Sequence, residues 1–230
     1  MFSFELISNV FKEKLLTIFV TRALLVAGSE PRFLSNTNLI YDYFISSAGF
    51  SFSKITVLSA AKTPSRKILP KIEDFLFRRD SEPIVFVYSG HGLPGKICPS
   101  PSSSITYATL ADSFLGVLGN FIFIDACCYA GSALPFFMDA YLIPQRGLFL
   151  GSTPANETAN GRSFLEGLID SYSRKKYFSK RMDLKQPKFS SVYSTPNVDN
   201  PLSFSSKKSS SKIKYPVRFG LALDYLLFSK

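Results

Sequence analysis

Short apolar runs alternate with amphipathic stretches along most of this 230-residue chain. The runs are rich in aliphatic and aromatic residues, a composition that is typical of β-strands. Five runs predict strands, at residues 23–27, 55–58, 84–88, 121–125 and 147–150. The third and fourth runs do not alternate in polarity, as expected for strands that are buried on both faces of a parallel sheet.

Between these runs the apolar residues recur at helical spacing. The pattern predicts helices at residues 34–48, 64–79, 104–118, 131–141 and 161–172. Pro70 disfavours the first turns of the second helix, and Pro135 is tolerable only in the first turn of the fourth. Residues 93–104 are rich in Pro, Gly and Ser and predict a loop. Because strands alternate with helices, we expect an α/β fold with a mostly parallel sheet and helices on both faces, an α/β/α sandwich.

The composition changes at residue 174, so residues 1–173 are interpreted as one domain. Residues 174–214 hold eleven Lys and Arg against two Asp, a net charge of +9 out of +10, which leaves the rest of the chain near +1. This Ser- and Lys-rich segment is predicted to be flexible. Its simplest interpretation is a solvated linker; a cleavable loop, or a contact with nucleic acid or an anionic membrane, are the alternatives. Residues 215–230 regain apolar character and are expected to pack back on the same domain.

The chain contains three cysteines, of which two are adjacent, so a disulfide framework is not expected. Reduced thiols favour an intracellular, cytoplasmic protein. Residues 15–28 are apolar but too short to cross a bilayer, and no secretory signal is evident at the N-terminus. One histidine and three cysteines without ligand spacing do not predict a metal site. No cofactor is expected, and calcium activation is left open by the sequence.

Two polar motifs follow neighbouring apolar runs. His91, the only histidine, follows the third run, and Cys127 and Cys128 follow the fourth. The carboxyl ends of parallel strands meet at one edge of the sheet, and a helix that begins after the cysteines would favour a thiolate. His91 would exchange the proton, while the Gly92 and Cys128 amides would bind an oxyanion. Taken separately, a lone histidine at a strand end is more often structural, and a cysteine pair is more often inert core.

The two motifs together resemble those of the caspase-fold cysteine peptidases, which include caspases, metacaspases and legumains. The resemblance rests on the sequence Tyr-Ser-Gly-His-Gly at residues 88–92 and Asp-Ala-Cys-Cys-Tyr-Ala-Gly-Ser at residues 125–132, and it covers residues 22–172. Residues 155–159 also look like the loop after the corresponding strand of metacaspase-like members. The resemblance implies a cysteine endopeptidase that acts on protein or peptide substrates.

The resemblance leaves the identity of the nucleophile open. Alignment on Cys-x-Ala-Gly selects Cys128, which we favour, whereas alignment on Asp-x-Cys selects Cys127, because the chain has one more residue between Asp125 and the glycine than the family pattern. Adjacent side chains of a strand point to opposite faces, so only one sulfur can face His91. By resemblance, Ser152 would line the substrate pocket, and Asp125 would line it if Cys127 is the nucleophile, whereas Ala126 takes that place if it is Cys128; the resemblance gives a slight preference for Arg or Lys at the cleaved position.

Two alternatives remain at this stage. The departure in motif spacing is compatible with a catalytically inactive relative that acts as a scaffold or interaction module. The resemblance also extends to the transamidase subunit of the family, which would require a membrane partner.

Overall fold

The structure is a computed structural model, and it describes residues 21–48, 50–77, 82–118, 121–139, 147–153, 155–173 and 192–194. The predicted flexible segment 174–214 lies outside the described residues except for residues 192–194. The predicted C-terminal element 215–230 lies outside them entirely.

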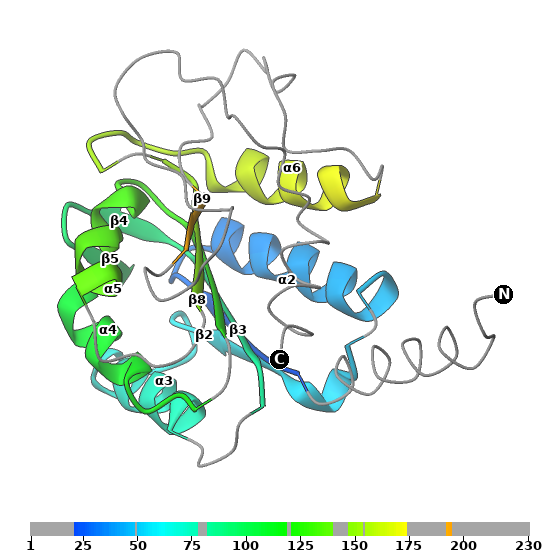
Figure 1. Cartoon of the computed structure of the whole chain (residues 1–230), viewed down its shortest axis with the longest axis horizontal. Coiled ribbons are helices and arrows are strands. Elements are labelled where there is room, and N and C mark those ends of the chain that lie inside the picture. The colour runs from blue at the N-terminus through cyan, green and yellow to red at the C-terminus, as the bar shows by residue number, and fades with distance from the viewer. Residues whose placement is uncertain are drawn as a thin grey trace, which may run out of the picture.

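A mostly parallel sheet runs through the middle of the domain (Figure 1). Its strands lie in the order β2-β1-β3-β7-β8-β9. Their bounds are β1 Arg22–Ala27, β2 Ile55–Ser59, β3 Ile84–Ser89, β7 Phe121–Ala126, β8 Gly147–Gly151 and β9 Val192–Ser194. The strands from β2 to β8 pair in parallel, whereas β9 pairs antiparallel with β8. Each of the predicted strands is present, with bounds that differ by at most one residue at either end.

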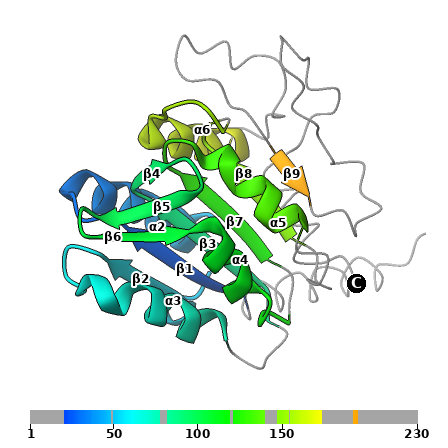
Figure 2. The same cartoon turned by 90° about the vertical axis from the view of Figure 1, so that its left-hand side faces the viewer.

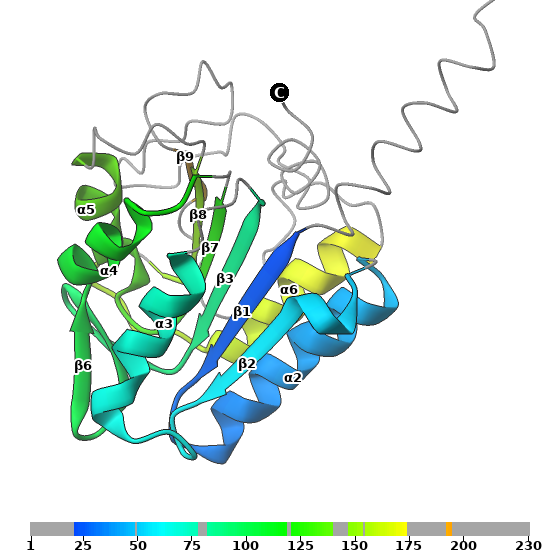
Figure 3. The ribbon, with the colours of Figure 1, turned by 90° about the horizontal axis from the view of Figure 1, so that it is seen from below.

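Helices cover both faces of this sheet (Figure 3). Helices α2 (Pro31–Ser46) and α6 (Gly161–Ser173) lie on one face. Helices α3 (Ile68–Leu76), α4 (Tyr107–Phe114) and α5 (Leu134–Asp139) lie on the other. The α/β class with a mostly parallel sheet and helices on both faces is therefore confirmed.

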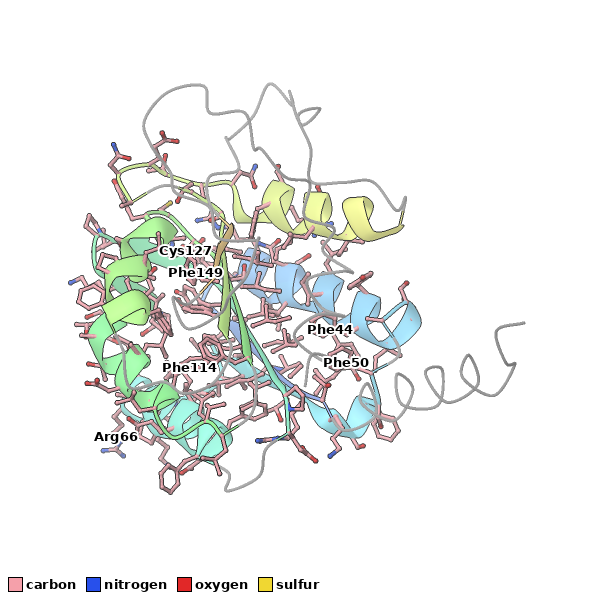
Figure 4. The ribbon with its side chains drawn as sticks, viewed as in Figure 1. Phe44, Phe50, Arg66, Phe114, Cys127 and Phe149 are labelled. Atoms are coloured by element: carbon pink, nitrogen blue, oxygen red, sulfur yellow. The ribbon has the colours of Figure 1, made fainter. Side chains whose placement is uncertain are left out.

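The core consists of two layers because successive side chains of each strand point to opposite faces of the sheet. Phe114 of α4 packs on Phe123 of β7, with ring centroids 6.1 Å apart. Phe149 of β8 meets the edge of Phe123 at 5.1 Å. On the opposite face Phe44 of α2 stacks on Phe50 at 4.6 Å (Figure 4). Burial of these large rings is the main stabilising contribution.

Prolines explain where three helices begin. Helix α2 starts at Pro31, three residues before the predicted start, because the fixed φ of proline suits the first helical position. Helix α3 starts only at Ile68, after a short 3-10 helix at Ser65–Lys67, so Pro70 lies in its first turn. Helix α5 follows another 3-10 helix, Ala130–Ala133, and Pro135 again lies in the first turn.

The prediction of a loop at residues 93–104 is wrong. This segment belongs to a three-stranded antiparallel sheet formed by β4 (His91–Leu93), β5 (Lys96–Ser100) and β6 (Ser103–Thr106) (Figure 2). Gly95, with a φ of +79°, allows the tight reversal between β4 and β5. The predicted helix 104–118 is shorter than expected because Thr106 caps α4, its hydroxyl accepting the Thr109 N–H at 3.1 Å.

The described helices include none that is both long enough and apolar enough to cross a membrane.

Candidate active site

The backbone around His91 is held in place by Tyr88. The buried hydroxyl of Tyr88 donates a hydrogen bond to the His91 carbonyl at 2.7 Å. The Tyr88 hydroxyl lies directly against Gly90, where an added Cβ would be 2.1 Å from the hydroxyl oxygen. The turn from β3 into β4 therefore requires glycine at residue 90 and presents His91 at the carboxyl edge of the sheet.

The imidazole of His91 is half exposed and lies against the N-terminal end of α2. Its Nε2 is hydrogen-bonded to Oε1 of Glu30, the residue that precedes the first turn of the helix. Phe33 meets the imidazole edge-on, with ring centroids 4.9 Å apart. Two side chains of one helix end thus define where the ring lies.

The two cysteines follow β7, and the structure separates their environments. Cys127 is buried, with 1% of its surface exposed, and its Sγ donates a hydrogen bond to the Cys128 carbonyl at 3.1 Å. Gly92 packs directly on this pair, since an added Cβ there would lie 2.5 Å from the Cys127 sulfur and 2.2 Å from the Cys128 carbonyl oxygen. Cys127, labelled in Figure 4, is therefore packed tightly beneath Gly92 of β4.

Asp125 and Tyr107 surround the Cys127 thiol. The Tyr107 hydroxyl donates to Asp125 Oδ2 at 2.7 Å and lies 3.5 Å from the Cys127 sulfur. Burial raises the pKa of Asp125 to about 6, opposed by the neighbouring thiol and hydroxyl groups. Burial, reinforced by the Asp125 charge, also holds the pKa of Cys127 well above its usual value, so this thiol stays protonated.

Cys128 is only partly buried, and its sulfur lies against the backbone of the loop after β8. Its Sγ accepts the Ala159 N–H at 3.3 Å. Of the two adjacent cysteines, Cys128 is therefore the one whose side chain is partly accessible to solvent.

A left-handed residue follows the cysteine pair. Tyr129 has a φ of +59°, which is uncommon for a residue other than glycine. Its N–H donates to the Glu157 carbonyl at 2.8 Å. Ser132 then links this turn to the small sheet, donating to the Tyr129 carbonyl at 2.7 Å and accepting the Gly95 N–H at 2.9 Å.

Ser152 follows β8 and holds the cysteine backbone. Its buried hydroxyl donates to the Cys127 carbonyl at 2.6 Å, and its own N–H donates to the Asp125 carbonyl at 2.9 Å. Thr153 supports the same turn, its hydroxyl accepting the Ala130 N–H at 3.3 Å. Ser152 thus positions the backbone from which Cys128 projects.

A cleft of about 560 Å³ lies between the N-terminal ends of α2 and α6, at the carboxyl ends of β3 and β7. It brings His91, Cys127 and Cys128 together. The other lining residues are Arg32, Phe33, Ser35, Asn36, Gly90, Ala126, Ala159, Asn160, Gly161 and Arg162. Asp125, Ser152 and Gly92, three residues that the sequence also assigned to the site, are buried and are not among the lining residues.

Sequence reasoning missed Glu30, Phe33, Tyr107 and Ala159. Glu30 is 61 residues from His91, and no spacing rule connects them. The only available signal was for Ala159, because residues 155–159 resemble the loop after the corresponding strand of metacaspases.

Comparisons with known proteins complete the description. Neither a protein-family model nor a curated protein sequence matches the chain. Solved structures do match. Raptor from Chaetomium thermophilum has a TM-score of 0.47 and 16% identity, over 68% of this chain and 18% of that one. Caspase-1 from Spodoptera frugiperda has a TM-score of 0.44 and 15% identity, over 73% of each chain. A secreted C11 cysteine protease from Bacteroides thetaiotaomicron has a TM-score of 0.42 and 14% identity, over 71% of this chain and 61% of that one.

Proposed function

We propose that this protein is a cysteine endopeptidase in which Cys128 is the nucleophile and His91 exchanges its proton. The observation that carries the proposal is the cleft that contains both side chains, with a backbone N–H directed at the Cys128 sulfur. A chain that places a partly exposed thiol, an imidazole and backbone amides around one cleft has the groups needed for acyl transfer.

The reaction follows from these groups. The Cys128 sulfur attacks the carbonyl carbon of the scissile peptide bond, and its proton passes to His91. The tetrahedral intermediate collapses when the C–N bond breaks, and His91 returns the proton to the leaving amine. Water then hydrolyses the thioester, with His91 accepting a proton, to release the acid and restore the thiol. Backbone amides near Gly92 and Cys128 are proposed to hold the oxyanion.

The cleft also bears on specificity. Arg32 and Arg162 line it, and no Asp or Glu belongs to the lining among the described residues. Asp125, which by resemblance would bind a basic residue, faces Tyr107 instead. We therefore expect an acidic residue at the cleaved position to be preferred over Arg or Lys, contrary to the sequence-based preference. Each arginine also pairs with a glutamate, so the preference should be about 2- to 5-fold, as for an exposed ion pair.

The test compares wild type with Cys128→Ala, Cys127→Ala and His91→Ala on a mixed peptide library, with circular dichroism to confirm folding. Cys128→Ala and His91→Ala should lose at least about 100-fold in kcat/KM, as expected for removal of a nucleophile or general base. Cys127→Ala should keep most of the activity. Loss of activity in Cys127→Ala, with retention in Cys128→Ala, would transfer the nucleophile to Cys127.

A second candidate function is a non-catalytic interaction module of the same fold. It is favoured by one observation: among the described residues, the His91 ring is hydrogen-bonded to Glu30 and to neither cysteine sulfur. This function predicts a wild-type protein that cleaves no library peptide and whose three cysteines react with iodoacetamide at similar, slow rates.

A further inference from the structure

We propose that Glu30 is a positioning residue that orients His91 by accepting a hydrogen bond from Nε2, so that Nδ1 is the nitrogen that exchanges the proton with Cys128. This inference rests on the proposed function, since it assigns the way in which His91 acts. It adds a carboxylate from the N-terminal end of α2 to the histidine and cysteine that follow β3 and β7.

The first argument is the way in which the carboxylate is held. Oε1 of Glu30 is hydrogen-bonded to His91 Nε2, while Oε2 pairs with Arg32 Nε at 2.7 Å. The Arg32 guanidinium in turn lies over the Phe33 ring, 4.8 Å from its centroid, and Phe33 contacts the imidazole edge. Each of the four side chains, Glu30, Arg32, Phe33 and His91, therefore contacts two of the others at the side of the cleft.

The second argument concerns the proton. The hydrogen bond with His91, assisted by the Arg32 charge, lowers the pKa of Glu30, so its side chain is a carboxylate at neutral pH. A carboxylate can only accept a hydrogen bond, and Nε2 must then carry the proton. In a neutral imidazole the other nitrogen holds the free lone pair, and Nδ1 is left to act as the base.

The third argument is that stability alone gives little reason for this pair. The His91 and Glu30 side chains are 51% and 42% exposed. Exposed ion pairs contribute little to the stability of a folded protein because water and salt screen them. Orientation of the ring toward the cleft, with the correct tautomer, is a role that such a pair can fill without a large stabilising energy.

The experiment measures the rate at which iodoacetamide alkylates Cys128 in the full chain, located by peptide sequencing in a mass spectrometer, between pH 5 and 9. The variants are Glu30→Gln, His91→Ala and the double variant. Glu166→Gln is the matched control, because Glu166 is a half-exposed glutamate that pairs with Arg162 of the same cleft and does not contact His91.

Glu30→Gln keeps only an uncharged, weaker acceptor for Nε2, so it should slow alkylation about 10-fold, less than the full effect of a general base. The decisive result is the double variant: if Glu30 acts through His91, Glu30→Gln should have no effect in the His91→Ala background. Glu166→Gln should stay within about twofold of wild type. In peptide cleavage, Glu30→Gln should lower kcat with little change in KM.

The outcomes separate the inference from the proposed function. Suppose that wild type cleaves no peptide, that each single variant slows alkylation, and that the double variant is no slower than His91→Ala. The coupling of Glu30 to His91 is then supported and the peptidase proposal fails. If His91→Ala slows alkylation and cleavage but Glu30→Gln does not, the role of Glu30 is overturned and the peptidase proposal stands. If Glu30→Gln slows alkylation of Cys128 by the same factor in wild type and in His91→Ala, the role of Glu30 is also overturned. Its effect would then be structural and independent of His91. If neither single variant slows alkylation, both proposals fail.

Discussion

Replacement of the buried Asp125 by Asn should stabilise the protein at neutral pH. The Asp125 carboxyl is fully buried, and burial raises its pKa from 3.8 to about 6. Between these two values the folded protein holds a proton that the unfolded chain has released. The free energy of unfolding therefore falls as the pH rises from about 4 to about 6, and the full cost is present above that window. The difference between the two pKa values corresponds to about 3 kcal/mol.

The Asn side chain does not ionise, so Asp125→Asn avoids this cost. The variant should be more stable than wild type by up to about 3 kcal/mol at pH 7, and the gain should vanish near pH 4. Urea unfolding at pH 4, 5, 6, 7 and 8 measures the difference. Asp112→Asn, which changes an exposed aspartate of α4, is the matched control for the loss of one carboxyl group. A difference that is independent of pH, or a variant that is less stable at pH 7, would refute the reasoning.

The same variant bears on the substrate pocket. Because Asp125 faces Tyr107 and is not among the residues that line the cleft, Asp125→Asn should leave the order of peptide preferences unchanged. A selective loss of cleavage after Arg or Lys would show that Asp125 contacts the substrate.

Three further predictions concern the packing around the cysteines and in the aromatic core. Gly92→Ala places a methyl group against Cys127 and the Cys128 carbonyl; it should destabilise the fold by about 1–3 kcal/mol in urea unfolding and slow alkylation of Cys128. An unchanged free energy of unfolding and an unchanged alkylation rate would show that β4 can shift to make room for the methyl group. Ser152→Ala removes the buried donor to the Cys127 carbonyl and should lower the free energy of unfolding in urea by about 1–3 kcal/mol. A variant as stable as wild type would contradict this role. Phe123→Ala, in the centre of the aromatic cluster, should cost about 3–5 kcal/mol in thermal or urea unfolding, and a loss below 1 kcal/mol would mean that the cluster is loosely packed.

The order of strands and helices followed from the sequence because local patterns govern it. A strand buried on both faces is mostly apolar, and the runs that predicted β3 and β7 match these strands within one residue at each end, although β7 also carries the buried Asp125. Helical spacing located α6 within one residue and α2 within three residues, since a helix on a sheet needs one apolar stripe. The small sheet from β4 to β6 was missed because Pro99 in β5 and the serines of β5 and β6 are uncommon in strands. Burial does alternate along β5, where Ile97 and Pro99 are the buried residues, and the hairpin at Gly95 joins β5 to β4.

The sequence by itself also indicated that His91 and the cysteine pair would meet, because the ends of neighbouring parallel strands share one edge of the sheet. It could not indicate how the surroundings of the two sulfurs differ. Gly92 and Tyr107 cover Cys127, whereas the Cys128 sulfur contacts Ala159, and both cysteines line the cleft. It gave no indication of Glu30 either, because a contact across 61 residues arises only when α2 packs beside the end of β3. Local patterns determine the elements, whereas burial and the partners of each polar group are properties of the folded chain alone.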